Sequence, residues 1–493
     1  MTFDLLVVGG GINGVGIARD AAGRGLKVLL CEQGDLAAAT SSASSKMIHG
    51  GLRYLEHFEF RLVRESLAER EVLLRIAPHL VRPTRFVLPH APGLRPRWMV
   101  RAGLLLYDRL GGGRTLPGSE AIDLRTEPRG RPLAGAARHG FVYSDCRVDD
   151  ARLTVLTARD AAERGAEIMT RTGMVEAQRE GTSWRAQLRT AGGEQREIAA
   201  RVLVNAAGPW VADVLRRAGL AGRAGLRLVK GSHIVVPRLY DGEHAYLLQN
   251  DDRRVAFVIP FERDFTLIGT TELPFDGDPV TAQITPGEIA YLCSAVGRWF
   301  ARPPHPDAVV WSFAGVRPLH DDRARNASAV TRDYAFDLDT AGAPALSIFG
   351  GKLTTYRRLA EHALDRLRPH LPGTGPAWTA GSVLPGGEGL SSVGMAALIA
   401  ELGREYPSLD AERLARSYGS DARRLLADGP GREFGAGLSE AELAWLVARE
   451  WARTADDVLW RRTKLGLQAT PAMRRAIDDF LSHRVPAAAA QAG

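Results

Sequence analysis

Cysteine is scarce in this chain. Its 493 residues include three cysteines, Cys31, Cys146 and Cys293, and no two of them form a CxxC pair. An odd and sparse set of cysteines excludes a disulfide framework and favours a reducing compartment. We also expect no metal site.

Long apolar runs are missing as well. No stretch approaches the roughly 20 consecutive apolar residues that a membrane-spanning helix needs. The N-terminus enters "FDLLVVGGG" directly, without the basic segment and longer apolar stretch of a secretory signal, so the sequence predicts no signal peptide. Any contact with a membrane must then be peripheral.

Charge of neither sign dominates. Lys and Arg number 64 against 57 Asp and Glu, which leaves a formal charge of +7, while 45% of the residues are hydrophobic and 25% are charged. These proportions are typical of a globular protein, and the length predicts about two to four domains. A basic excess can attract anionic lipid, phosphate or nucleic acid. Spread over so long a chain it indicates a solvated surface, and we expect no nucleic-acid partner.

The first thirty residues have a strand–helix–strand pattern. "FDLLVVGGGINGVGIARDAAGRGLKVLLCEQ" reads as an apolar strand over Phe3–Val8, a glycine-rich turn, a helix from about Asn13 and a second apolar strand over Val28–Cys31. Short continuous apolar runs are typical of parallel strands that are buried on both faces. The segment therefore predicts the start of a Rossmann-like domain in an α/β fold.

The turn between these strands has the spacing of a dinucleotide-binding site. Gly9, Gly11 and Gly14 form G-x-G-x-x-G. The first glycine permits the tight turn, the second lets the backbone approach a pyrophosphate, and the third lets helix and strand pack closely. Glu32 follows the second strand, where a carboxylate can accept hydrogen bonds from ribose hydroxyls. Together these residues predict a bound dinucleotide, either NAD or FAD.

The stretch "SSASSKMIHGGLRYLEH", Ser41–His57, favours FAD. It has no clean helical or strand period, and it follows directly on the nucleotide-binding pattern. Its serines and backbone N–H groups would lie along the rest of a long dinucleotide, and Gly50 and Gly51 would let the backbone approach the isoalloxazine ring without a Cβ clash. Glu32 argues against a ribose 2′-phosphate. Taken alone, the serines are equally typical of a solvated loop.

Further elements follow from periodicity. Helical patterns cover residues 59–78, 96–110 and 149–165, and an apolar strand over 199–205 ends in "NAAGPW". A turn of small residues after a strand is a place where a parallel sheet can receive a nucleotide. The sequence thus predicts a second contact between the sheet and the dinucleotide.

The same patterns predict the domain organisation. From about residue 227 to 340 the chain alternates in the strand manner, which predicts a mostly antiparallel sheet that covers the substrate. We expect one FAD-binding and cap unit over residues 1–371, with the cap mainly at 227–340. Residues 372–389 are rich in Gly and Pro and read as a linker, and residues 390–493 are predicted to form an all-helical domain.

Motifs along nearly the whole chain match one family. They include "DLLVVGGGINGVGIARDAAGRGLKVLLCE", "SSASSKMIHGGLRYLEHFEF", "YSDCRVDDARL", "LVNAAGPWV", "LVKGSHIVVP", "IGTTE", "AGVRPL", "TRDY", "FGGKLTTYR" and "EWARTADDVLWRRTKLGL". With them the chain resembles the FAD-dependent glycerol-3-phosphate dehydrogenases, the respiratory, quinone-linked kind, within the glycine/D-amino-acid oxidase superfamily. Glu272 departs from the family's usual "IGTTD", and "NAAG" replaces the commoner "NATG".

The resemblance implies FAD as cofactor, glycerol 3-phosphate as substrate and a quinone, ubiquinone or menaquinone, as electron acceptor. The cofactor-binding residues that the glycine pattern and the family motifs predict together are Gly9, Gly11, Ile12, Asn13, Gly14, Glu32, Thr40, Ser41, Ser42, Ser45, Lys46, His49, Gly50, Gly51, Ala207, Gly208, Gly350, Gly351, Lys352, Leu353 and Thr354. A helix that begins just after Gly350 and Gly351 would direct its N-terminal partial charge at the flavin.

Oxidation of glycerol 3-phosphate needs a cationic clamp for the phosphate and a group that takes the hydroxyl proton or stabilises the alkoxide. Guanidinium groups bind phosphate in bidentate fashion. The family motifs supply a cationic and aromatic set of predicted substrate-binding residues: Arg53, Tyr54, His233, Arg317, Arg332 and Lys352. Among these, His233, Arg317 and Lys352 are the predicted catalytic residues.

The identity of the proton acceptor stays open at this point. His233 is favoured because an imidazole titrates near neutral pH, and Lys352 is the alternative. Two other functions also remain. One is an oxidase of the same substrate that uses oxygen, and the other is a basic surface-binding protein that merely carries FAD.

Quinones are lipid-soluble, so a quinone-linked enzyme must meet a membrane. We therefore expect a cytoplasmic protein that binds peripherally to the anionic inner face of the cell membrane. "LRPRWMVRAGLLLYDRLGG", residues 94–112, is the predicted contact, because its arginines can meet lipid phosphates while Trp98 and the leucines enter the interface. An ordinary amphipathic helix packed on the core is the alternative. The sequence leaves open whether the protein forms a homodimer.

Overall fold

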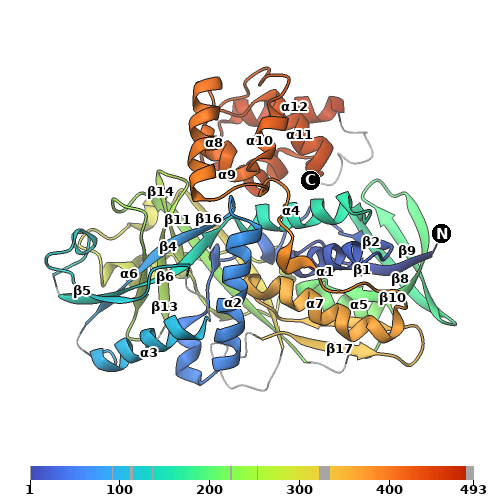
Figure 1. Ribbon diagram of the computed structural model, residues 1–493, viewed down its shortest axis with the longest axis horizontal. Coiled ribbons are helices and arrows are strands. Elements are labelled where there is room, and N and C mark those ends of the chain that lie inside the picture. Colours follow the sequence, from blue (N-terminus) through green and yellow to red (C-terminus); the bar gives the residue numbers. More distant parts are fainter. Residues whose placement is uncertain are drawn as a thin grey trace.

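The fold is taken from a computed structural model. The parts of the chain that it describes are residues 2–91, 93–111, 115–135, 137–222, 225–252, 254–320 and 333–484. Two β-sheets lie side by side, and a group of helices from the C-terminal part of the chain covers one edge of this pair (Figure 1). No helix in the described ranges is long and apolar enough to cross a bilayer.

The first sheet is the Rossmann-like one and has the strand order β17-β18-β10-β1-β2-β7, with β8 and β9 extending it beside β10. The pairs β1–β2, β1–β10, β10–β18 and β2–β7 are parallel. Its strands are β1 (Thr2–Val8), β2 (Val28–Cys31), β7 (Glu167–Met169), β8 (Thr172–Glu180), β9 (Ser183–Thr190), β10 (Gln195–Asn205), β17 (Ala335–Asp339) and β18 (Ala345–Phe349). The predicted strand over Val28–Cys31 is confirmed to the residue.

Helices bury the apolar strands of this sheet. One face packs against α1 (Ile12–Gly23), α4 (Asp150–Glu163) and α7 (Tyr356–Leu367), which share a continuous core with β1, β2 and β10. The opposite face contacts the short helix α5 (Val211–Arg217). Burial on both faces explains why these strands read as unbroken apolar runs.

The second sheet has the order β15-β11-β14-β13-β12-β4-β6-β3, with β16 beside β11 and β5 beside β6. Its strands are β3 (Met47–Ile48), β4 (Val81–His90), β5 (Glu120–Asp123), β6 (His139–Val148), β11 (Leu226–Pro237), β12 (Ala245–Gln249), β13 (Val255–Phe261), β14 (Phe265–Gly269), β15 (Leu273–Pro274) and β16 (Trp311–His320). All of its pairs are antiparallel except β12–β4. The helix α6 (Pro286–Gly297) packs on one face, and α2 (Phe60–Ile76) and α3 (Arg97–Leu110) pack on the other.

The composition of this cap sheet differs from the prediction in two ways. Four of its strands, β3 to β6, come from residues 47–148 rather than from 227–340. Conversely β17, which was expected in the cap, pairs with β18 and joins the first sheet. Alternation of apolar residues identifies a strand but not its partner, and partners distant in sequence are set by tertiary packing.

The C-terminal domain is helical in its described part, as predicted. It contains α8 (Ser392–Glu405), α9 (Ala411–Tyr418), α10 (Asp421–Leu425), α11 (Glu440–Glu450), a π-helical turn (Asp457–Arg462) and α12 (Pro471–Arg484). Ser391, Asp410 and Ser439 cap the starts of α8, α9 and α11 by accepting a backbone N–H. The domain has its own apolar core and lies above α4 (Figure 1).

The predicted linker, residues 372–389, is packed on the first domain rather than extended in solvent. The Trp378 indole donates to the Asp20 carbonyl at 3.1 Å, and the Leu384 N–H donates to the Ile76 carbonyl at 2.7 Å. Short turns of 3-10 helix connect many elements; they span Thr40–Ser42, Leu52–His57, Pro128–Gly130, Gly208–Trp210, Pro279–Thr281, Pro306–Ala308, Leu353–Thr355, Arg368–His370, Thr379–Gly381 and Leu465–Leu467.

Candidate active site

A cavity of about 1940 Å³ lies between the two sheets. The β1–α1 turn, the loop after β2 and the turn after β10 line its first-sheet side, and strands β13 and β16 contribute from the cap. The volume is larger than the roughly 300–1,000 Å³ of ordinary small-molecule sites, so it leaves room for a dinucleotide and a small substrate together.

The three glycines of the G-x-G-x-x-G motif have different roles. Gly9 has φ +114°, and a Cβ there would lie 2.5 Å from the Ala206 carbonyl oxygen. A Cβ at Gly14 would lie 2.0 Å from the Gly9 carbonyl oxygen, so both positions need glycine for the fold itself. A Cβ at Gly11 would meet only the Ser41 hydroxyl, at 3.1 Å, and would project into the cavity. The absence of a side chain at Gly11 therefore leaves room for a ligand, as a bound pyrophosphate requires.

Glu32 lines the cavity at the end of β2. Its carboxylate accepts the Gly10 N–H at 2.6 Å and the Gly34 N–H at 2.7 Å. Burial raises the pKa of Glu32, and these two backbone donors act against that rise. The geometry holds the carboxylate at the cavity edge, where the ribose of a dinucleotide would lie.

The loop after β2 brings most of its predicted residues to the cavity. Thr40, Ser41, Ser42, Ser45, His49 and Gly51 all line it. Lys46 does not, because its ammonium group is buried and donates to Asp150 Oδ1 at 2.7 Å. The prediction that Lys46 contacts the cofactor is therefore not supported by its position; its side chain anchors the loop from behind.

Gly50 is also behind the cavity wall. Its N–H donates to the Tyr107 hydroxyl at 2.8 Å, and that hydroxyl donates to the buried carboxylate of Asp145 at 2.7 Å. A Cβ at Gly50 would lie 2.6 Å from Leu67. Of the Gly-Gly pair, only Gly51 faces the cavity, and Gly50 is required for packing.

A second group of predicted cofactor residues meets the loop from the far end of the chain. Gly350, Gly351, Lys352, Leu353 and Thr354 line the cavity, as do Ile12, Asn13, Ala207 and Gly208. The Thr354 hydroxyl accepts the His49 N–H at 3.1 Å, which joins the two motifs.

The prediction of a helix directly after Gly351 needs correction. A 3-10 turn over Leu353–Thr355 intervenes, and α7 begins at Tyr356. The Asn13 amide donates to the Gly350 carbonyl at 3.2 Å, while its oxygen Oδ1 is buried and has no hydrogen-bond partner among the described residues. An orphaned acceptor in the cavity wall fits a polar ligand that donates to it.

Cationic side chains gather in the same cavity. Arg53, Tyr54, Arg317 and Lys352 all line it. Arg317 donates to Glu272 Oε1 at 3.2 Å, and the Lys352 ammonium lies 3.9 Å from the centre of the Tyr54 ring. Arg332 lies outside the described residues. The arrangement is a cationic pocket that opens onto a dinucleotide cradle.

His233 is not placed where the prediction expected it. Its ring is buried behind the cavity wall, stacked on Phe313 with a centroid separation of 4.9 Å, and its Nε2 lies 2.8 Å from the Ser45 hydroxyl. Burial holds the pKa of His233 well below its ordinary value, and the charges of Arg317 and Lys46 lower it further. The histidine that does line the cavity is His49, and burial together with Lys352 lowers the pKa of His49 to about 3.

Several lining residues were missed by the sequence reasoning. Phe313 comes from the cap strand β16, where alternation alone does not show which residues face a ligand, and Thr270 directly follows β14. Asp456, Trp460 and Arg461 come from the C-terminal domain, for which the sequence predicted only helices and no site residue. The only available signal was their place within the family motif "EWARTADDVLWRRTKLGL".

Comparison with known families defines the class of protein. Residues 4–357 match the family described as FAD dependent oxidoreductase, and residues 377–486 match the family described as the C-terminal domain of alpha-glycerophosphate oxidase. Together with the Rossmann-like sheet and its glycine cradle, these matches make the protein a flavoprotein oxidoreductase with FAD as its cofactor.

Individual relatives narrow the class. The chain is 53% identical to glycerol-3-phosphate dehydrogenase of Pseudomonas aeruginosa, covering 98% of this chain and 96% of that protein. It is 51% identical to D-erythritol 1-phosphate dehydrogenase of Brucella abortus, covering 98% of each. The X-ray structure of glycerol-3-phosphate dehydrogenase from Bacillus halodurans complexed with FAD aligns with a TM-score of 0.79 at 28% identity, covering 98% of this chain and 91% of that one. The chain belongs to the family of FAD-dependent glycerol-3-phosphate dehydrogenases.

Proposed function

We propose that the protein oxidises sn-glycerol 3-phosphate to dihydroxyacetone phosphate. The observation that carries this proposal is the cationic pocket of Arg53, Arg317 and Lys352 in the same cavity as the dinucleotide cradle. Bound FAD supplies the hydride acceptor for C2 of the substrate. The names of relatives that match over nearly the whole chain support the same substrate.

Each cation has a part in holding the substrate. Arg317 is the phosphate anchor, because a guanidinium can bind phosphate in bidentate fashion. Glu272 orients the Arg317 guanidinium through an ion pair at 3.2 Å. Arg53 and Lys352 supply further positive charge on the cavity wall, and Arg332 is a proposed second anchor.

His49 is the proton acceptor that the geometry favours over His233. It lines the cavity, whereas His233 lies behind Ser45 and Phe313. Its pKa of about 3 keeps the imidazole neutral at physiological pH, so that it can accept a proton. A phosphate dianion near Lys352 would act against the smaller, Lys352-dependent part of this shift, while the larger part, which comes from burial, would remain.

Anaerobic bleaching of the flavin tests the proposed reaction. Glycerol 3-phosphate is expected to bleach the flavin absorbance of the purified holoprotein, whereas glycerol, which lacks the phosphate, is not. D-erythritol 1-phosphate is the informative alternative substrate, since a relative that is 51% identical is named for it. If the flavin stays oxidised with glycerol 3-phosphate but bleaches with D-erythritol 1-phosphate, glycerol 3-phosphate is not the substrate and the larger polyol phosphate is.

A quinone is the proposed electron acceptor. Relatives at about half identity are named dehydrogenases, one of them aerobic, which favours a dehydrogenase over an oxygen-using oxidase. Turnover with a soluble quinone analogue under nitrogen is the test. Turnover with oxygen alone at a rate equal to that with the quinone would favour the oxidase.

The cavity mouth supports peripheral binding to the inner face of the cell membrane. Phe58 and Trp98 are 78% and 70% exposed, and Met99 and Leu106 are exposed beside them. Phe58, Met99 and Leu106 also line the cavity, so an exposed apolar rim leads from the surface toward the flavin site. Apolar side chains with neighbouring arginines such as Arg95 suit an anionic lipid surface. A lipid-soluble quinone could enter along this rim.

A further inference from the structure

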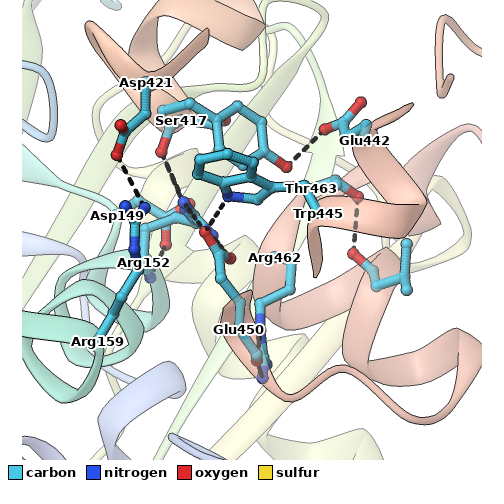
Figure 2. Close-up of polar contacts among 12 residues, drawn as sticks. Asp149, Arg152, Arg159, Ser417, Asp421, Glu442, Trp445, Glu450, Arg462 and Thr463 are labelled. Carbon is cyan, nitrogen blue, oxygen red and sulfur yellow. Dashed lines mark hydrogen bonds and ion pairs between the residues drawn. The ribbon is translucent and has the colours of Figure 1, made fainter. Parts of the chain in front are cut away.

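The C-terminal domain is joined to the FAD-binding domain by buried charges. From α4, Arg152 donates to Glu450 and to the Ser417 carbonyl, and Arg159 pairs with Asp421 at 2.8 Å (Figure 2). The side chains of Arg152 and Glu450 are completely buried. Because a buried charge is tolerated only when it is paired, these contacts hold the domain in one position.

Another buried contact of the C-terminal domain holds the loop that lines the cofactor cavity. Asp35 lies three residues after Glu32, and it is only 4% exposed. Its Oδ2 accepts Arg461 Nε and Arg462 Nη1, each at 2.6 Å, and its Oδ1 accepts Arg462 Nη2 at 2.8 Å. The neighbouring residues Gln33, Gly34 and 37–45 line the cavity, whereas Asp35 does not. The loop is therefore held from its outer side by the C-terminal domain.

A second contact supports the same wall. Asp457 accepts Arg171 Nη2 at 2.6 Å and is also paired with Arg461. The backbone N–H of Arg171 donates to the Gly34 carbonyl at 2.7 Å, and the next N–H, of Thr172, donates to the Glu32 carbonyl at 2.7 Å. The carbonyls of Glu32 and Gly34 are thus tied, through residues 171 and 172, to the π-helical turn Asp457–Arg462.

The far end of the loop is tied in a related way. Asp150 accepts the Ser44 hydroxyl at 2.7 Å and the Lys46 ammonium at 2.7 Å. Its neighbour Asp149 accepts the ammonium of Lys464 at 2.9 Å, which comes from the C-terminal domain. Residues 457–464 therefore contact Asp35 and Arg171 at the start of the cofactor loop, and they contact Asp149, the neighbour of Asp150, at its end.

We propose that this C-terminal segment is a clamp on the flavin: Arg461 and Arg462 act as positioning residues that hold Asp35, and through it the loop Gln33–Ser45, in the conformation that retains FAD. Release of the dinucleotide would require this loop to move, and the buried ion pairs oppose that movement. The proposal rests on FAD binding and not on the identity of the substrate.

The test compares two buried aspartates of nearly equal exposure at the same domain interface. Asp35→Asn removes the charge that Arg461 and Arg462 hold, whereas the control Asp421→Asn removes the partner of Arg159, away from the loop. Asp35 and Asp421 are 4% and 5% exposed. Holoprotein is diluted, and FAD release is followed by the rise in flavin fluorescence, with thermal unfolding measured in parallel.

We expect FAD to leave Asp35→Asn roughly tenfold or more faster than wild type, since the loop is then no longer held by a buried charge pair and opens more readily. Asp421→Asn should release FAD at the wild-type rate. A wild-type rate in Asp35→Asn would overturn the clamp, and so would equal acceleration in both variants, which would mean that any loosening of the interface frees the flavin. If Asp35→Asn does not fold, Arg462→Gln replaces it under the same criteria, because the Arg461–Asp35 pair is then retained and Arg462 does not line the cavity.

Discussion

At the scale of single residues, the cavity separates glycines that the fold needs from those that a ligand needs. Gly14 has no space for a Cβ because the Gly9 carbonyl oxygen would lie 2.0 Å away, whereas Gly11 has open space beyond the Ser41 hydroxyl. Gly50 and Gly51 are both required for packing: a Cβ at Gly50 would lie 2.6 Å from Leu67, and a Cβ at Gly51, which has φ +81°, would lie 2.2 Å from the Tyr54 ring. The position of a glycine in a motif therefore does not by itself show whether the fold or a ligand requires it.

Gly11→Ala is expected to fold and to lose FAD. Its new methyl group would occupy the space that a pyrophosphate needs, with only the Ser41 hydroxyl to displace. The measurement is the flavin absorbance per mole of purified protein, together with the unfolding temperature of the apoprotein. Gly14→Ala is the control, and it should fail to fold. A yellow Gly11→Ala protein with full flavin content would contradict this account of the cradle.

Arg317→Ala is expected to raise KM for glycerol 3-phosphate while the FAD content stays unchanged. Losing one charge-assisted contact to the phosphate costs about 1.5–3 kcal/mol, which corresponds to roughly a tenfold to hundredfold change. The variant also removes the guanidinium that donates to Glu272 Oε1 at 3.2 Å in the wild type. Steady-state kinetics on the flavin-loaded variant provide the measurement. An unchanged KM would remove Arg317 from the substrate site.

His49 and His233 give a paired prediction. His49→Asn should slow flavin reduction by glycerol 3-phosphate by about 10²–10⁴-fold, the usual contribution of a general base. His233→Asn should slow it far less, because His233 reaches the cavity only through the Ser45 hydroxyl at 2.8 Å. Anaerobic stopped-flow of both variants at saturating substrate makes the comparison. The reverse order of effects would restore His233 as the acceptor.

At the scale of elements, α3 has two opposed faces. Leu104 and Tyr107 are buried, and Tyr107 supports Gly50, while Trp98, Met99 and Leu106 are exposed, and Met99 and Leu106 also line the cavity. One face of the helix therefore packs on the core, as the alternative interpretation expected. The other face remains available for a membrane.

The triple variant Trp98→Ser, Met99→Ser and Leu106→Ser is expected to lose binding to anionic liposomes. The serines remove the exposed apolar area that would enter the interface, and the buried face of α3 is untouched. Flotation with liposomes measures the binding, and wild type should float less at high salt. The variant must still bleach its flavin with glycerol 3-phosphate. Equal flotation of variant and wild type would place the membrane contact elsewhere.

At the scale of the whole molecule, buried histidines make stability depend on pH. His79 is 1% exposed near the domain interface, and neither ring nitrogen has a hydrogen-bond partner among the described residues. Burial lowers the pKa of His79 to about 3, and the charges of Arg152 and Arg159 contribute. In the unfolded chain an imidazole has a pKa of about 6.5. The unfolded state therefore binds the proton more readily between these two values.

Wild type should lose stability as the pH falls below about 6.5 toward about 3, because protonation of His79 favours the unfolded chain. His79→Asn, which cannot gain this charge, should show a flatter fall. Unfolding midpoints at pH 7 and pH 5 measure the difference between the two proteins. Glu262, whose pKa burial raises to about 7, acts in the opposite sense in both proteins and cancels from the comparison. Parallel curves for variant and wild type would contradict the role of His79.

Much of this protein followed from the sequence alone. The βαβ start, Glu32, the serine loop and the C-terminal helices were predicted because each depends on local periodicity or on glycine and serine chemistry at short range. The family resemblance added the cofactor and the cationic residues Arg53, Arg317 and Lys352, and the structure places all three at one cavity.

The tertiary structure decided what depends on distant partners. The strands within residues 47–148 belong to the cap sheet. The Lys46 ammonium pairs with Asp150 and does not face the cavity. His233 lies behind Ser45, whereas His49 lines the cavity. The contact of Arg461 and Arg462 with Asp35 joins residues more than 400 positions apart. Which side of a residue faces a cavity, and which buried charge finds its partner, are properties of packing between elements, and no local pattern in the chain encodes them.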